Sequence, residues 1–193
     1  MFILEVKLMN PPNTSREEIM RVSRKIVSEK GLPALNMRAL AKECGIALGT
    51  LYNYYSDKDE LVVAAIESVW QDILEKSAPD SGVSFSQYVT QTYAHIIEKL
   101  KDYPDFLAAH SISVAGSVKG KARGMMERCF GKIRSELHEV LQNDKNVDRS
   151  VFSDIFCEEN LIEHVLDNII ILIIKGKPDC ATLTEILDRL LYR

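Results

Sequence analysis

Helix-capping signals recur along this chain of 193 residues, and they constrain its fold more than any other sequence feature. Ser15 with Glu18 and Ser84 with Gln87 have the spacing of capping boxes, in which two side chains satisfy backbone amides at a helix start. Apolar residues follow these caps at intervals of three and four, which places them on one helix face. The sequence offers no convincing strand-type alternation and no internal repeat. We therefore predict an all-α fold of about nine helices.

Caps and helix breakers also predict where several helices begin and end. Gly31 with Pro33 should end the first long helix, and Ser56 or Asp57 should begin the fourth. Further helices are expected at about 37–44, 48–54, 105–115, 120–142, 152–175 and 182–191.

Composition excludes several classes of protein. Hydrophobic residues make up 46% of the chain and charged residues 27%, as in ordinary globular proteins. The longest apolar runs, such as 169–174, are too short to cross a bilayer, and the first eight residues lack the cleavage site of a signal peptide. The four cysteines lie far apart and form no CxxC pair: Cys44, Cys129, Cys157 and Cys180. We expect a cytoplasmic protein without a membrane segment, whose thiols are free.

Charge is distributed unevenly along the chain. Between Thr14 and Lys58 there are eight Lys or Arg and five Asp or Glu, a net charge of +3, whereas the whole chain carries −4. The remainder therefore carries −7. A basic N-terminal quarter joined to an acidic remainder is typical of a chain in which one module faces phosphate.

Two short helices are expected to meet around Gly45. Ala41 supplies the small side chain that lets them cross closely, and Gly45 suits the left-handed backbone of a sharp reversal. Ile46 and Leu51 would anchor the second helix on the first and leave its other face free for a DNA major groove. This spacing predicts a helix-turn-helix.

A longer motif, LAxxxGIxxGTLYxYYxDKDEL, runs from residue 40 to residue 61. It resembles the N-terminal signature of TetR-family repressors, and the resemblance covers about Ser15 to Leu61. It implies a DNA-binding domain at 14–60, with three helices that include the helix-turn-helix, and a helical effector-binding and dimerisation domain at 61–193. The second domain resembles the family only in being helical and of suitable size.

The resemblance also implies which residues meet DNA. They are Arg38, Leu48, Gly49, Thr50, Tyr52, Asn53, Tyr54 and Lys58. Lys58 would bind phosphate at the start of the fourth helix, where the helix dipole also favours an anion. Tyr55 is expected in the core. Ala47 stands where the family often has a capping Ser or Thr, so the recognition helix loses a cap of roughly 1 kcal/mol.

An effector pocket and a dimer interface are expected in the C-terminal helices. Large side chains that could line a pocket for a small apolar effector are Trp70, Tyr88, Tyr93, Phe106, His110, Met126 and Phe130. Apolar stripes that could pair two subunits into a four-helix interface are Leu161, Val165, Ile169, Leu172 and Ile173, with Leu183, Ile186, Leu187 and Leu190. The alternative for both sets is that they form the domain's own core.

The sequence thus favours a ligand-responsive repressor that binds a pseudo-palindromic, double-stranded operator as a homodimer. One alternative is a helical adaptor for a protein partner, and another is a DNA-binding regulator without a small effector. No nucleophile–base arrangement is visible, and the histidines share no ligand spacing. We therefore predict no enzyme activity, no cofactor and no metal.

Overall fold

The computed structural model describes residues 14–75, 82–108 and 119–192, and within them every regular element is helical. The described elements are α1 (Arg16–Lys30), the 3₁₀ turn η1 (Leu32–Ala34), α2 (Met37–Glu43), α3 (Leu48–Tyr52), α4 (Lys58–Leu74), α5 (Phe85–Leu100), α7 (Lys119–Asn143), the 3₁₀ turn η2 (Arg149–Val151), α8 (Glu158–Ile174) and α9 (Ala181–Leu191). The all-α prediction is confirmed. No helix in these ranges is long and apolar enough to cross a membrane.

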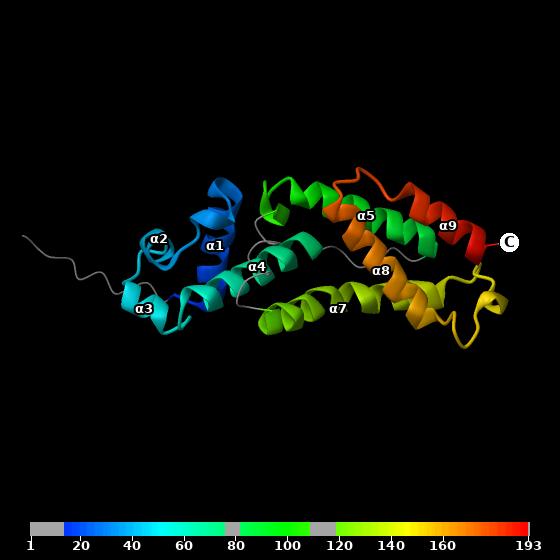
Figure 1. Cartoon of the computed structure of the whole chain (residues 1–193), viewed down its shortest axis with the longest axis horizontal. Helices are drawn as coiled ribbons and strands as arrows, with labels where there is room; N and C mark the ends of the chain where they lie inside the picture. The colour runs from blue at the N-terminus through cyan, green and yellow to red at the C-terminus, as the bar shows by residue number, and fades with distance from the viewer. Residues whose placement is uncertain (1–13, 76–81, 109–118, 193) are drawn as a thin grey trace, which may run out of the picture.

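The helices gather in two groups (Figure 1). Helices α1 to α3 lie at one end, and α5, α7, α8 and α9 form a larger group at the other, while α4 runs from the first group into the second. The C-terminus lies at the end of the molecule opposite α3. Helix α4 packs on α1 as well as on α5 and α7, so it joins the two groups in one continuous apolar core.

Most of the predicted helix starts are confirmed. The Ser15 hydroxyl accepts from the Glu18 amide at 3.2 Å, and Asp57 caps α4 by accepting from the Glu60 amide at 2.7 Å. Ser84 and Gln87 form the expected reciprocal capping box at α5. The Glu18 carboxylate departs from the prediction, because it pairs with Arg21 on the next turn of α1.

One predicted helix start in the C-terminal half is wrong. Helix α8 begins at Glu158 rather than near residue 152, because the Ser153 hydroxyl accepts from the Phe156 amide at 3.0 Å and closes a local turn. Helix α9 spans Ala181–Leu191, as expected to within one residue. The helix expected at 105–115 is described only at 106–108, and its remainder lies outside the described residues.

Polar contacts join α1 to α4 and to the turn after α5. Arg24 donates to the Ser68 hydroxyl at 2.5 Å and lies 3.7 Å from the Asp72 carboxylate, both on α4. The Tyr103 hydroxyl, just beyond α5, donates to Asp72 at 2.9 Å. Burial, together with this bond, raises the pKa of Tyr103, which keeps its hydroxyl a neutral donor. Ser28 adds a direct bond from α1 to this turn, donating to the Asp102 carbonyl at 2.6 Å.

At the far end of the molecule, a buried carboxylate ties three segments together. Asp144, just after α7, accepts from the Phe85 amide at 2.9 Å and from the Tyr192 hydroxyl at 2.7 Å. Burial alone would raise the pKa of Asp144, but the bonds from Tyr192, Phe85 and the Asn146 amide together lower it. The carboxylate therefore stays ionised and holds Tyr192, near the C-terminus, against the start of α5 and the end of α7.

Candidate nucleic-acid interface

The turn between α2 and α3 has the geometry that the sequence predicts. Gly45 adopts φ 67°, which is the left-handed region. Its amide donates to the Lys42 carbonyl at 3.2 Å, and the Ile46 amide donates to the Ala41 carbonyl at 3.0 Å. Ala41 and Leu51 are buried. The chain therefore reverses within a few residues, as a helix-turn-helix requires.

Helix α3 depends on packing rather than on a cap. Its N-cap residue, Ala47, makes no side-chain hydrogen bond, which confirms the expected loss. Five residues are too few for a stable isolated helix. The buried Leu51 holds α3 against the core, and Tyr55 just beyond it is buried as predicted.

The face of α3 turned away from the core carries several of the predicted DNA-contact residues. Gly49 and Asn53 are exposed, and Tyr52 is 49% exposed, which is unusual for a large aromatic side chain. Leu48 and Thr50 are half-buried at its edges.

Tyr54 lies apart from this exposed group. Its hydroxyl donates to the Thr14 carbonyl, and its own carbonyl accepts from the Arg16 guanidinium at 2.8 Å. The same guanidinium lies 5.1 Å from the centre of the Tyr55 ring, a cation–π contact. Tyr54 therefore holds the N-terminal end of α1 against the α3 region, and its DNA contact stays a prediction.

Cationic side chains flank the exposed face of α3. Arg38 on α2 and Lys58 at the start of α4 are exposed, and neither forms an ion pair within the described residues. Lys42 is a further exposed cation that sequence reasoning did not select. It lies four residues after Arg38 and therefore on the same side of α2, and this spacing is the signal that could have found it. Lys25, by contrast, is paired with Glu43 at 3.4 Å.

The five described side chains of the predicted effector pocket are buried, and none of them lines the groove that opens between α8 and α9. Trp70 packs on Phe106 and Phe130, with ring centroids 5.7 and 5.5 Å away. Tyr88 donates to Glu136 and Tyr93 to the Lys177 carbonyl, each at 2.7 Å, and all five rings are buried. His110 and the side chain of Met126 lie outside the described residues. The small-effector pocket stays a prediction.

The predicted dimer stripes divide between core and surface. Buried within the chain's own core are Leu161, Val165, Ile169, Ile173, Leu183 and Leu187. Leu172 is half-buried, while Ile186 and Leu190 are 49% and 43% exposed. Sequence reasoning missed Ile171 and Ile174 as exposed residues, because a fully apolar run does not show which side faces out.

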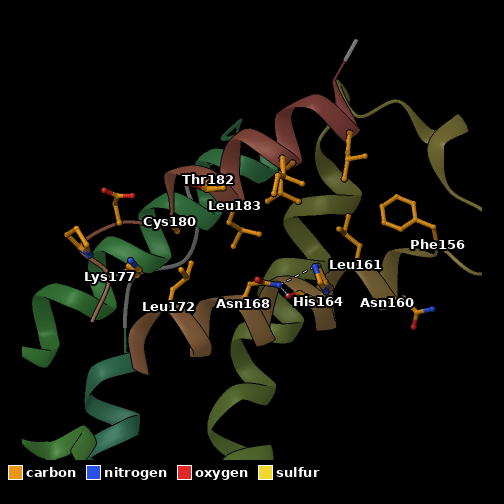
Figure 2. Close-up of a pocket in the computed structure, with 15 residues that line it drawn as sticks. Phe156, Asn160, Leu161, His164, Asn168, Leu172, Lys177, Cys180, Thr182 and Leu183 are labelled. Carbon is orange, nitrogen blue, oxygen red and sulfur yellow. Dashed lines mark hydrogen bonds between the residues drawn. The ribbon is translucent and has the colours of Figure 1, made fainter. Parts of the chain in front are cut away.

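A groove of about 780 Å³ lies between α8 and α9, on the side of the predicted stripes (Figure 2). Leu172 and His164 of α8 and Leu183 and Ile186 of α9 are among its lining residues. Within α8, the Asn168 side-chain amide donates to the His164 carbonyl at 2.8 Å, and both residues line the groove. The groove is therefore a mostly apolar surface with a short polar strip.

The crossed helices α2 and α3, the glycine turn between them and the exposed face of α3 define a helix-turn-helix protein. Residues 19–65 match the family model described as bacterial regulatory proteins, tetR family. The match runs from α1 into the first half of α4, so the helix-turn-helix region of this chain is similar to that family.

Similar sequences are regulators, and they match this chain in part. An uncharacterised HTH-type transcriptional regulator of Haemophilus influenzae is 33% identical over 95 residues, which are 48% of this chain and 50% of that protein. The HTH-type transcriptional regulator UidR of Escherichia coli K12 is 32% identical over 79 residues, 40% of each chain. The chain thus matches half or less of the length of these curated relatives.

Solved structures share the fold over most of the chain. BioQ, solved with its double-stranded DNA operator, superposes with a TM-score of 0.58 at 16% identity, covering 85% of this chain and 88% of that one. A putative tetR family regulator from Shewanella sp. PV-4 superposes with a TM-score of 0.52 at 16% identity, covering 93% and 100%. At this identity the likeness establishes the fold alone.

Proposed function

We propose that this chain is a transcriptional regulator that binds a pseudo-palindromic DNA operator as a homodimer, with residues 14–60 as its DNA-binding domain and 61–193 as its dimerisation and sensing domain. The observation that carries the proposal is the exposed face of α3, with Tyr52 and Asn53 turned outward and Arg38 and Lys58 beside it. A helix of this kind fits the major groove of B-DNA, and cations at its margins meet phosphates.

The exposed apolar residues of α8 and α9 support a homodimer. Ile174 is 65% exposed, and Ile171, Ile186 and Leu190 are 46%, 49% and 43% exposed. Ile186 and Leu190 line the groove beside α8, and exposed apolar side chains of this size mark a surface that a partner covers. A second copy of the same two helices would bury them in a four-helix interface, and the two-fold symmetry would match a pseudo-palindromic operator.

A gel-shift experiment with a pool of random duplexes tests operator binding. The chain should retain a subset of duplexes, and repeated rounds should enrich a pseudo-palindrome. Tyr52→Phe should weaken binding of that duplex while leaving the unfolding temperature and the solution mass unchanged, because its exposed hydroxyl has no partner within the described residues. Binding of no duplex at all would refute the proposal and favour the helical adaptor for a protein partner.

We also propose that the regulator responds to a small apolar effector, and that binding of this ligand relieves repression. A second candidate is a regulator that needs no effector, and the close packing of Trp70 with Phe106 and Phe130 favours it. Trp70 is the only tryptophan in the chain, so energy transfer from it reports the position of a bound apolar fluorophore. Saturable binding of anilinonaphthalene sulfonate with strong quenching of Trp70 would support an effector site, and its absence would support the second candidate.

A further inference from the structure

The recognition helix lies in a segment without charge. From residue 44 to residue 56 the chain has thirteen consecutive uncharged residues, and this run contains the whole of α3. The middle of the exposed face is formed by Gly49 and Asn53, which are four residues apart and therefore one turn from each other. Thr50 and Tyr52 lie to either side. The surface that would enter a groove thus offers amide, hydroxyl and methyl groups and no cation.

Gly49 is a glycine that the fold does not need. Its φ is not in the left-handed region, unlike that of Gly45. A Cβ built at Gly49 meets nothing within 4 Å, so neither backbone conformation nor packing in the described chain excludes a side chain. Glycine nevertheless costs a helix up to about 1 kcal/mol relative to alanine, and α3 already lacks a capping side chain. On the exposed face of α3, a glycine leaves the backbone open to a partner that approaches more closely than a methyl group allows.

The chemistry of the face indicates which base pairs it can read. Guanine is read most often by Arg or Lys through its O6 and N7, and α3 has neither. Adenine is read by a side-chain amide through N6 and N7, and the exposed amide of Asn53 has no partner within the described residues. The methyl group of thymine accepts apolar contacts, for which the half-buried Leu48 and the methyl group of Thr50 are available.

We propose that α3 seats its backbone at Gly49 directly against base edges and selects A·T pairs at the positions beneath it. The nearest cations, Arg38 and Lys58, lie on other helices and serve the phosphates and the margins of each half-site. This inference rests on the proposed function, because it specifies the operator that the regulator reads.

Selection of bound sites with two proteins tests the base preference. The full chain and its Asn53→Ala variant are each used to enrich sites from the same random duplex pool, and the two motifs are compared. Positions at which the variant loses its preference are those under α3. We expect A·T pairs there, enriched at least about fivefold by the wild type, which corresponds to roughly 1 kcal/mol per base pair.

The outcomes separate the two proposals. G·C pairs at the positions that Asn53→Ala relaxes, or an unchanged motif in the variant, would overturn the A·T inference while leaving operator binding intact. Failure of the wild type to enrich any site would instead count against the proposed function itself.

The close approach at Gly49 has a matched pair of variants. Gly49→Ala should keep or raise the unfolding temperature, since the folded chain has room for the methyl group, yet weaken binding of the selected duplex by about tenfold or more. Gly131→Ala makes the same change inside α7, where the added Cβ also meets nothing within 4 Å, and should bind DNA like the wild type. Equal DNA affinity of Gly49→Ala and the wild type would overturn the close-approach part of the inference.

Discussion

The helix-turn-helix region and the C-terminal helices place their predicted functional residues in opposite environments. In the first, Arg38, Gly49 and Tyr52 are exposed, while the residues that shape the turn are buried. In the second, most of the predicted interface and pocket residues, such as Val165 and Tyr88, are buried within the chain itself. A short recognition helix must separate its packing face from its binding face. In an apolar helix of a bundle, by contrast, the same residue types can serve both the chain's own core and an interface with a partner.

The variant with the largest expected effect tests whether the exposed apolar residues of α8 and α9 form a dimer interface. Ile186→Asp should give monomer or aggregate and abolish operator binding, because one short α3 provides too few contacts alone. Ile186 is a better site than Ile173 or Leu187, both of which are buried in the chain's own core. Analytical ultracentrifugation and gel shift measure the two effects.

The matched control is Thr90→Asp, which adds the same charge to an exposed position on α5 and should stay dimeric. A monomeric Ile186→Asp protein that still binds the operator tightly would contradict the prediction that DNA binding requires a dimer formed through α8 and α9.

A second pair of variants compares apolar packing in the helix-turn-helix region with apolar packing in the C-terminal helices. Leu51→Ala and Leu187→Ala each remove a fully buried side chain, so each should lower the free energy of unfolding by about 2–5 kcal/mol. Leu51→Ala should release α3 and lose DNA binding with the dimer mass unchanged. Leu187→Ala should show the larger loss of dimer. Urea unfolding, solution mass and gel shift distinguish the two patterns, and identical patterns would contradict the division of roles.

An acid titration tests the buried Asp144 carboxylate of the C-terminal group. The folded pKa of Asp144 is lowered from 3.8, so its stabilising contribution is present above about pH 4 and is lost as pH falls through the lower folded value. Asp144→Asn should cost about 1–3 kcal/mol at pH 7, because the Phe85 amide, the Asn146 amide and the Tyr192 hydroxyl lose an ionised partner. The difference from the wild type should shrink toward pH 3, as measured by urea unfolding. A difference that is constant with pH would exclude the ionised form as the source.

The smallest effect concerns one phosphate contact. Lys58→Ala should weaken specific and non-specific DNA binding alike and reduce the slope of log affinity against log salt by about one unit. Lys145→Ala removes an equally exposed lysine from the turn after α7 and should leave that slope unchanged. Fluorescence anisotropy across a salt series measures both, and equal slopes would remove Lys58 from the interface.

The sequence predicted the N-terminal region better than the C-terminal one for a physical reason. Gly45, Ala41 and Leu51 have local roles whose geometry follows from spacing along the chain, and the structure confirms them. The outward side of the run 169–174 depends on how α8 meets α7 and α9, which no local pattern encodes.

Local competition between side chains explains the error at the start of α8. The Ser153 hydroxyl accepts from the Phe156 amide in a local turn, which keeps these residues out of the helix and places the start of α8 at Glu158. The groove between α8 and α9 is lined by residues of both helices, which pack on α7 and α5, and it has no signature of its own in the sequence.

The bonds among Arg24, Asp72 and Tyr103 have a thermodynamic consequence for the whole molecule. Arg24 of α1 and Tyr103 of the turn after α5 both hold the Asp72 carboxylate of α4, and Ser28 of α1 donates directly to the Asp102 carbonyl of that turn. Displacing the turn would therefore break contacts that also position α1. Linkage is reciprocal, so a ligand that displaced the turn and thereby changed DNA affinity would have its own affinity changed by DNA by the same factor.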